Sequence, residues 1–277
     1  MIVLITGCSS GFGLAAAEAF ARRGDQVVAT ARDPSRATAL HAAQARYSNL
    51  SIQRLDVTDQ GSINAAVAAT VDQHQRLDVL VNNAGIGVLG ALEVLDEPTL
   101  REVFDTNLFG AMAVTRDVLP HMRRQQSGRV IFMNAIGGIL TTGFLGAYCA
   151  SKHALDCVAA VYDLELRPFG IRVSSVYPSA FHTAMGGNLG LVAGEGTPYA
   201  EPTRAYFDGL SHRVATGPTD LSPVVDAVID AATSPEPRLR YLVAPHLAET
   251  LDPALTALER LHERELGMTP GIAQSPR

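Results

Sequence analysis

The chain has 277 residues, of which 47% are apolar and 18% are charged, and its formal net charge is −6. This composition is typical of a globular protein with a sizeable core, and the lack of a basic run argues against nucleic acid or anionic membrane as a partner. The chain contains no run of about 18 apolar residues, so no membrane span is predicted. The N-terminus does not have the pattern of a signal peptide. The three scattered cysteines favour a reducing cytoplasm and do not suggest a metal centre.

Short apolar runs alternate along the chain with longer amphipathic stretches. The runs predict buried strands and the stretches predict helices, so together they predict βαβ units and a parallel sheet. With helices on both faces this is a doubly wound, Rossmann-like α/β fold, in one domain over residues 1–277. The expected strands are Ile2–Ile5, Gln26–Thr30, Ser51–Arg54, Val79–Asn82, Val130–Met133, Arg172–Tyr177 and Arg240–Val243. The expected helices are Gly13–Arg23, Ala37–Tyr47, Ser62–His74, Leu100–Arg124, Tyr148–Leu166, Leu221–Thr233 and Pro253–Glu265.

One segment interrupts this alternation. Met185–Pro202 is rich in glycine, alanine and proline, and it follows the sixth expected strand, at the edge where the carboxyl ends of the strands meet. A long loop in a compact domain is commonly a lid or disordered. We interpret residues 185–216 as a lid over the ligand cleft, and the tail from Gly267 as a flexible end.

A glycine-rich turn follows the first expected strand and leads at once into a helix, in Thr6-Gly7-Cys8-Ser9-Ser10-Gly11-Phe12-Gly13. The glycines permit a tight turn and let the backbone approach a pyrophosphate, while the helix N-terminus supplies free N–H groups. The spacing differs from the common G-x-G-x-x-G fingerprint, so a purely structural turn is the alternative. The position directly after the N-terminal strand favours a dinucleotide site.

The end of the second expected strand indicates which dinucleotide binds. An acidic residue there would bind the ribose hydroxyls, but the sequence reads Ala29-Thr30-Ala31-Arg32. A guanidinium pairs with a 2′-phosphate, which a carboxylate would repel. We therefore predict NADP(H) as the cofactor, with a solvated loop charge at Arg32 as the alternative.

The single lysine of the chain lies four residues after a tyrosine, in Tyr148-Cys149-Ala150-Ser151-Lys152, whereas the other basic residues among the 22 are arginines. Positions i and i+4 share a helix face, so the ammonium would lie beside the phenol. A free tyrosine titrates near about 10, and a neighbouring positive charge favours the phenolate. The pair suits acid–base chemistry; a codon bias toward arginine with one surviving surface lysine is the alternative.

These residues, with Asn82-Asn83-Ala84-Gly85, resemble the short-chain dehydrogenase/reductase family from residue 2 to about residue 185, and look most like its hydroxysteroid and retinol dehydrogenase branch. The resemblance implies a seven-stranded parallel sheet, a homodimer or homotetramer, and hydride transfer between a nicotinamide and an alcohol or carbonyl. It implies that Tyr148 exchanges the proton, that Lys152 also orients the cofactor, and that Asn107 holds a water in the proton relay.

The cofactor contacts follow partly from the resemblance. It implies that Asp56 binds the adenine amino group and that Thr183 contacts the cofactor, while Ser179 departs from the usual glycine and bears on the placement of the nicotinamide. The candidate cofactor-binding residues are Gly7, Ser9, Ser10, Gly11, Phe12, Gly13, Arg32, Asp56, Val57, Asn83, Ala84, Gly85, Tyr148, Lys152, Pro178 and Thr183.

Position 135 departs from the family in a way that bears on catalysis. Family members usually carry a serine about thirteen residues before the tyrosine, but here the residue is Ala135. A methyl group cannot donate a hydrogen bond to the reacting oxygen, and losing one such donor typically costs about 10²–10³ in rate. Three explanations stay open: an introduced Ser→Ala change, a natural alanine with Thr141, Thr142 or Asn134 as the donor, or a cofactor-binding sensor without catalysis.

The expected walls of the cleft are mostly apolar, which favours a lipophilic secondary alcohol or ketone as the substrate. Arg204, His212 and Arg213 could bind an acidic substrate tail, although a solvated face is the alternative. The candidate substrate-binding residues are Ala135, Phe144, Phe181 and Met185, with Ile136, Leu140, Leu145, Leu189, Leu191 and Val192 nearby.

Overall fold

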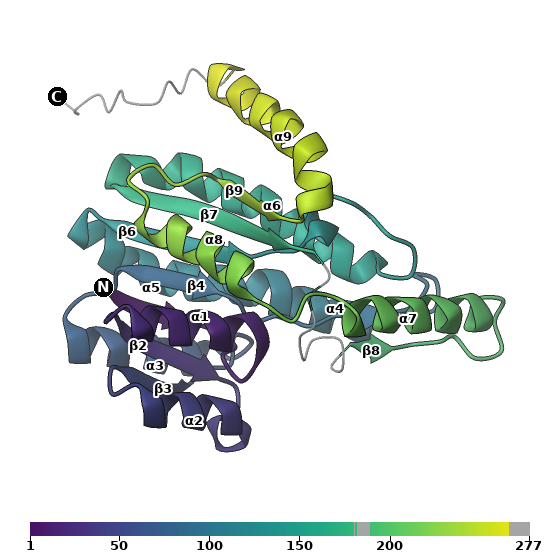
Figure 1. The fold of residues 1–277 in the computed structure, drawn as a ribbon, viewed down its shortest axis with the longest axis horizontal. Coiled ribbons are helices and arrows are strands. Elements are labelled where there is room, and N and C mark those ends of the chain that lie inside the picture. Colours follow the sequence, from purple (N-terminus) through teal and green to yellow (C-terminus); the bar gives the residue numbers. More distant parts are fainter. Residues whose placement is uncertain (180, 182–188, 266–277) are drawn as a thin grey trace.

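A parallel sheet of seven strands forms the centre of the protein (Figure 1). The computed structural model describes residues 1–179, 181 and 189–265. The strand order is β3-β2-β1-β4-β6-β7-β9, and every neighbouring pair is parallel. All the strands expected from the sequence are present, so the Rossmann-like α/β fold is confirmed. These strands are β1 (Ile2–Ile5), β2 (Gln26–Ala31), β3 (Leu50–Arg54), β4 (Val79–Asn82), β6 (Gly128–Met133), β7 (Ile171–Pro178) and β9 (Arg240–Val243).

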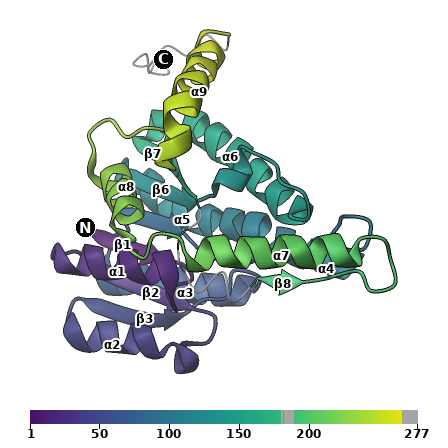
Figure 2. The same cartoon turned by 45° about the vertical axis from the view of Figure 1, so that its right-hand side comes forward.

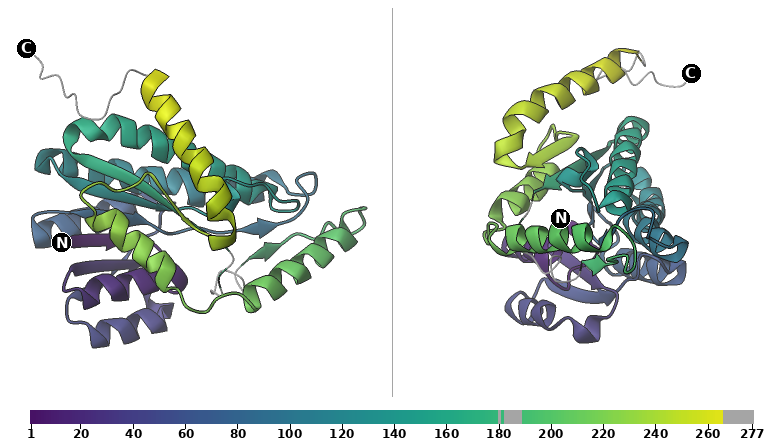
Figure 3. Two further views of the ribbon diagram at one scale, coloured as in Figure 1. Left: turned by 45° about the horizontal axis from the view of Figure 1, so that its top comes forward. Right: turned by 90° about the vertical axis from the view of Figure 1, so that its right-hand side faces the viewer.

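Helices cover both faces of the sheet (Figures 1 and 3). One face carries α1 (Gly11–Arg22), α2 (Thr38–Arg46) and α8 (Ser222–Thr233). The opposite face carries α3 (Gln60–His74), α5 (Ala111–Gln125) and α6 (Gly146–Leu166). Among the helices that the structure describes, none combines the length and apolar character needed to cross a bilayer.

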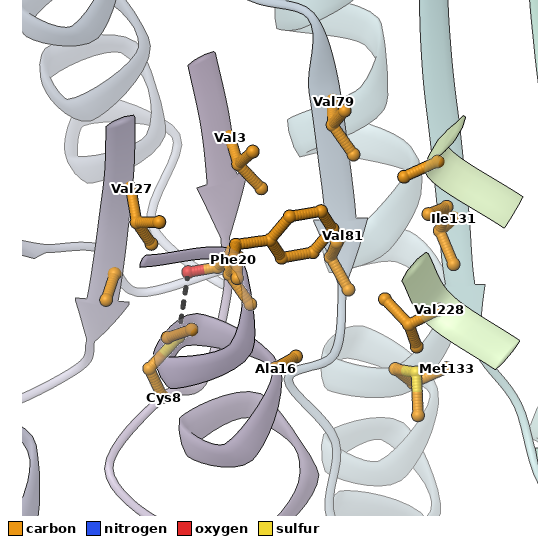
Figure 4. Close-up of a cluster of buried hydrophobic side chains, with 14 of the residues drawn as sticks. Val3, Cys8, Ala16, Phe20, Val27, Val79, Val81, Ile131, Met133 and Val228 are labelled. Carbon is orange, nitrogen blue, oxygen red and sulfur yellow. Dashed lines mark hydrogen bonds between the residues drawn. The ribbon is translucent and has the colours of Figure 1, made fainter. Parts of the chain in front are cut away.

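The core divides into two layers because successive side chains of a strand point to opposite faces. On one face, Val3 of β1 and Val81 of β4 pack against Phe20 of α1, whose side chain is fully buried (Figure 4). On the other face, Leu4 and Leu80 from the same two strands pack under α3 and α5. This packing fixes the carboxyl ends of β1 and β4 side by side.

The helix expected over Leu100–Arg124 is interrupted. It consists of α4 (Glu97–Phe104), a π-helical turn (Asp105–Gly110) and α5. At the end of the π turn, a Cβ added to Gly110 would lie 2.8 Å from Val57 Cγ2, so the chain passes very close to the loop after β3. A π turn inserts one residue into a helix, and hydrophobic periodicity in the sequence does not reveal such an insertion.

The interval predicted as a lid contains two regular elements that the sequence did not indicate. The two-residue strand β8 (Gly190–Leu191) pairs in parallel with β5 (Val88–Leu89), and α7 (Ala200–Ala215) follows it. Together β8 and α7 extend from the body of the molecule beside α4 (Figures 1 and 2). At the other end of the fold, α9 (Pro245–Glu265) begins eight residues earlier than the predicted Pro253, which lies inside the helix. A proline usually occupies the first turn of a helix, so its interior position was not evident.

Candidate active site

The glycine-rich turn after β1 and the loop after β4 meet at the carboxyl edge of the sheet. In open α/β sheets, ligands bind at such an edge, where neighbouring connections run in opposite directions. Gly7 has a φ of +70°, and a Cβ added there would lie 2.9 Å from Ala84 Cα. The two loops therefore touch at Gly7, where a side chain would collide with Ala84. Because Gly7 has no side chain, the backbone of the turn stays accessible to a ligand.

Thr6 and Asn83 join these two loops. The Thr6 hydroxyl accepts hydrogen bonds from the backbone N–H groups of Asn83 (2.9 Å) and Ala84 (3.0 Å). The Asn83 side-chain amide donates to the carbonyls of Thr6 (2.9 Å) and Gly7 (2.8 Å). A Cβ added to Gly13 would lie 2.4 Å from Asn83 Nδ2, so this amide also rests against the start of α1. Thr6 was not among the residues predicted from the sequence, although a threonine directly after the first strand is a signal that could have indicated it.

The N-terminus of α1 faces this edge without a capping side chain. Ser10 occupies the N-cap position in an extended conformation and makes no side-chain cap hydrogen bond. The first N–H groups of a helix have no partner within the helix, and the helix dipole places positive charge there. The turn of Ser9, Ser10, Gly11 and Phe12 therefore fits a pyrophosphate.

Phe181 packs against the glycine-rich turn. Its ring packs edge-to-face on Phe12 at a centroid distance of 5.7 Å, and its side chain is 7% exposed within the same cluster as α1. The sequence placed Phe181 on the substrate wall, whereas the structure packs it under the glycine-rich turn.

The carboxyl ends of β2 and β3 carry the residues expected to meet the adenosine. Arg32 is exposed. The Asp33 carboxylate accepts hydrogen bonds from the Ser35 hydroxyl (2.6 Å) and N–H (3.1 Å), and these bonds lower the pKa of Asp33. Burial disfavours the charged form of Asp56, but hydrogen bonds from Thr58 and the positive charge of Arg32 lower its pKa overall. The Asp33 carboxylate is thus held within its own loop, while the Arg32 guanidinium lies at the surface.

Tyr148 and Lys152 lie on one face of α6, as their spacing predicted. Lys152 Nζ is 5.8 Å from the centre of the Tyr148 ring and donates a hydrogen bond to the Met133 carbonyl (2.8 Å). Lys152 is only 3% exposed, and burial lowers the pKa of its ammonium to about 8. Burial also raises the pKa of Tyr148 above its ordinary value. Burial therefore favours the protonated phenol in the protein alone, and the shift toward the phenolate by Lys152 together with an oxidised nicotinamide stays a prediction.

Asn107 lies in the π-helical turn and fixes the loop after β4. Its Oδ1 accepts from the Ile86 N–H (2.8 Å), and its Nδ2 donates to the Ile86 carbonyl (2.9 Å) and the Ser151 hydroxyl (3.0 Å). A Cβ added to Gly85 would lie 3.2 Å from Asn107 Oδ1 and 3.7 Å from Lys152 Nζ. Asn107, Gly85 and Lys152 therefore come together.

Ala135 is partly buried at the end of β6, and its N–H donates to Asn134 Oδ1 (2.9 Å). The other end of the Asn134 amide donates to the Lys152 carbonyl (3.2 Å), so Asn134 clamps β6 to α6. Of the other donors considered, Thr141 and Thr142 are exposed, and the Thr142 hydroxyl lies 3.9 Å from Cys149 Sγ. Asn134 therefore serves the backbone at this site.

Three further candidate residues, Phe144, Arg204 and Arg213, lie around the arm formed by β8 and α7. Phe144 has a φ of +61°, and its ring lies 5.6 Å from that of Tyr206 in α7. Arg204 pairs with Glu195, and the Arg213 guanidinium lies 5.6 Å from the centre of the Tyr206 ring, so both arginines have partners within the arm. Pro178 ends β7, while Thr183 and Met185 lie outside the described residues. Within the described ranges, no group of three or more histidine, cysteine or acidic side chains could hold a metal ion.

The family model and the similar proteins that a comparison finds all point to the same group of dehydrogenases. A family model described as short chain dehydrogenase matches residues 1–191. Human 17-beta-hydroxysteroid dehydrogenase type 1 is 32% identical over 99% of this chain and 88% of that protein, and bovine retinol dehydrogenase 8 is 36% identical over 84% and 79%. A solved short-chain dehydrogenase from Streptomyces avermitilis is 35% identical, covers 95% of each chain and superposes with a TM-score of 0.80. Other solved structures of this fold hold NAD in one case and NADP in another, so the fold alone does not select the cofactor.

The family model covers well over half of the chain, and its matched residues include the glycine-rich turn, Asn107 and the Tyr148–Lys152 pair. The chain belongs to the short-chain dehydrogenase/reductase family of oxidoreductases, in the branch of the hydroxysteroid and retinol dehydrogenases.

Proposed function

We propose that the chain is an NADP(H)-dependent oxidoreductase that interconverts a lipophilic secondary alcohol and its ketone. The observation that carries this proposal is the position of Lys152, whose ammonium lies 5.8 Å from the centre of the Tyr148 ring and beside the Gly85 backbone. This position brings a proton donor and a buried cation to the edge where the glycine-rich turn would hold a dinucleotide.

The residues present fit a bound dinucleotide. A Cβ at Gly7 or Gly13 would collide with the neighbouring loop, and the N-terminus of α1 is uncapped. Asp56 would accept from the adenine amino group through the carboxylate oxygen that Thr58 leaves free, and Ser9, Ser10 and Val57 would be further contacts of the cofactor. When bound, NADPH supplies the hydride.

Tyr148 is the proton donor of the proposed reduction. Its raised pKa keeps the phenol protonated at neutral pH, which suits donation to a carbonyl oxygen. The Lys152 ammonium then stabilises the phenolate that this step leaves behind. Since the pKa of Lys152 is about 8, most of the lysine carries its charge at neutral pH.

Two observations support NADP(H) over NAD(H). Both hydrogen bonds from Ser35 end on Asp33 Oδ1, so this oxygen is held within its own loop. The Arg32 guanidinium lies at the surface near the Asp56 carboxylate, whose pKa it lowers. A charge-assisted pair with a phosphate contributes about 1.5–3 kcal/mol.

We expect Arg32→Asp to lower the preference for NADPH over NADH by about 10- to 100-fold, because it replaces the cation with a repelling carboxylate. The comparison is between the kcat/KM values for the two cofactors. Arg36→Asp changes the net charge equally in the same exposed loop and serves as the control. An unchanged cofactor ratio in Arg32→Asp would disprove the assignment.

We expect the affinity for NADPH to fall as the pH rises through about 8, because the Lys152 ammonium then loses its proton and its attraction for the anionic cofactor. Binding near this pH should be accompanied by proton uptake. Fluorescence titration of NADPH between pH 7 and pH 9 measures the effect, and Lys152→Met should make the affinity independent of pH in this range. A Kd that is constant across the range in the unchanged chain would contradict the role of the lysine.

We also propose that β8 and α7 form the lid of the substrate site, supported by the contact between Phe144 and Tyr206.

A homodimer or homotetramer is the proposed assembly, since Phe109 and Val161 are 56% and 45% exposed on helical segments that the family would use for subunit contact. The three cysteines are free, in keeping with the proposed reducing cytoplasm.

Ala135 favours a second candidate function. A chain that binds NADP(H) without turnover would act as a cofactor sensor or a regulatory protein. It would bind NADPH tightly and would remain inactive when the serine is restored, which separates it from an enzyme impaired at one position.

A further inference from the structure

Gly87 is the point where the lid and the catalytic helix meet. A Cβ added to Gly87 would lie 2.6 Å from Leu189 Cδ1, 3.6 Å from Tyr148 Cδ2 and 4.0 Å from Tyr148 Cε2. The Leu189 side chain and one edge of the Tyr148 ring therefore approach the same atom of the backbone. They reach it from different segments, the start of the lid and the first turn of α6.

The opposite edge of the Tyr148 ring faces a second glycine. A Cβ added to Gly137 would lie 3.4 Å from Tyr148 Cε1 and 3.4 Å from Cys149 Sγ. The ring thus lies between two glycines, and the Leu189 methyl group adds apolar bulk on the Gly87 side. The Leu189 side chain therefore borders the phenol on the Gly87 side, and Cys149 borders it on the Gly137 side.

The position of Leu189 is held by backbone hydrogen bonds. The Gly190 N–H donates to the Gly87 carbonyl (2.9 Å), and the Val192 N–H donates to the Leu89 carbonyl (2.8 Å). These bonds form the short parallel ladder between β5 and β8. Because Leu189 directly precedes this ladder, its side chain is fixed over Gly87. Leu189 is partly buried, whereas Leu191, in the ladder itself, is 42% exposed.

We infer that Leu189 determines substrate specificity. It limits the size of the carbonyl substituent that lies beside the Cδ2 edge of Tyr148. The chain then reduces ketones with one small substituent, such as a methyl group, in preference to ketones that carry bulky substituents on both sides of the carbonyl. This inference rests on the proposed function, since it requires the carbonyl oxygen to reach the Tyr148 hydroxyl.

Two aryl ketones test the inference. Acetophenone has a methyl arm, and isobutyrophenone has an isopropyl arm in the same place. Leu189→Ala should raise the ratio of kcat/KM for isobutyrophenone to that for acetophenone by about tenfold or more, because a few buried methyl groups discriminate by this amount. Leu191→Ala removes the same atoms from an exposed site and should leave the ratio unchanged. An unchanged ratio in Leu189→Ala, or an equal shift in Leu191→Ala, overturns the inference.

A second experiment tests the contact itself by thermal unfolding of the full chain. Gly87→Ala should lower the melting temperature, and adding Leu189→Ala should restore most of the loss because it removes the colliding methyl group. Adding Leu191→Ala to Gly87→Ala should restore nothing. Independent, additive losses for Gly87→Ala and Leu189→Ala would overturn the contact. If no variant reduces either ketone even when Ala135→Ser is added, the proposed function fails and the specificity assignment fails with it, whereas reduction with an unchanged ratio refutes Leu189 alone.

Discussion

Replacing Ala135 with serine is expected to raise kcat for ketone reduction by about 10²–10³. Ala135 lies two residues after the end of β6 and thirteen residues before Tyr148, where the family supplies a hydroxyl to the reacting oxygen. A hydroxyl aimed at that oxygen stabilises the charge that develops on it, worth about 2.7–4 kcal/mol at the transition state. Ala135 is partly buried, and its N–H is already fixed by Asn134, so serine would enter a site whose backbone is in place.

The rate of NADPH oxidation with a saturating ketone measures this effect, and the Kd for NADPH in the same variant shows whether the cofactor site is intact. Thr142→Val in the unchanged chain is the matched control, since it removes one of the alternative hydroxyls. A rise in kcat for Ala135→Ser with unchanged NADPH affinity identifies an enzyme impaired at one position. An active chain whose kcat does not respond has another donor, and an inactive chain that binds NADPH is a sensor.

The fold was predictable because its central strands are short, apolar and regularly spaced. Leu4 and Leu80 face one layer of helices, and Val3 and Val81 face the other, so these strands are buried on both sides and appear in the sequence as continuous apolar runs. The Tyr148–Lys152 pair was predictable for a similarly local reason, since four residues bring two side chains to one face of a helix.

The features that the sequence did not reveal depend on contacts between distant segments. The β5–β8 ladder joins two-residue strands about a hundred residues apart, too short to leave an alternating pattern. Phe181 was predicted on the substrate wall, but its packing partner is Phe12 in the turn after β1. The pKa values of Tyr148 and Lys152 likewise depend on burial by the surrounding chain, which spacing alone does not indicate.

The second large effect concerns Tyr148. In the Ala135→Ser chain, Tyr148→Phe is expected to lower kcat by about 10²–10⁴, because the phenol is the group that gives its proton to the carbonyl oxygen. The substitution removes one oxygen and keeps the ring, which packs between Gly87 and Gly137. Among the contacts of the described residues, the Tyr148 hydroxyl makes no hydrogen bond that the fold would lose, so the variant should unfold at nearly the same temperature.

A single-turnover experiment measures this step most directly. The Ala135→Ser chain and its Tyr148→Phe derivative are loaded with equal amounts of NADPH, mixed with a saturating ketone, and followed by the absorbance of the reduced nicotinamide. The proposed mechanism predicts that both proteins bind NADPH and that only the protein with Tyr148 oxidises it rapidly. Equal rates of oxidation in the two proteins would show that the proton comes from elsewhere and would contradict the proposed mechanism.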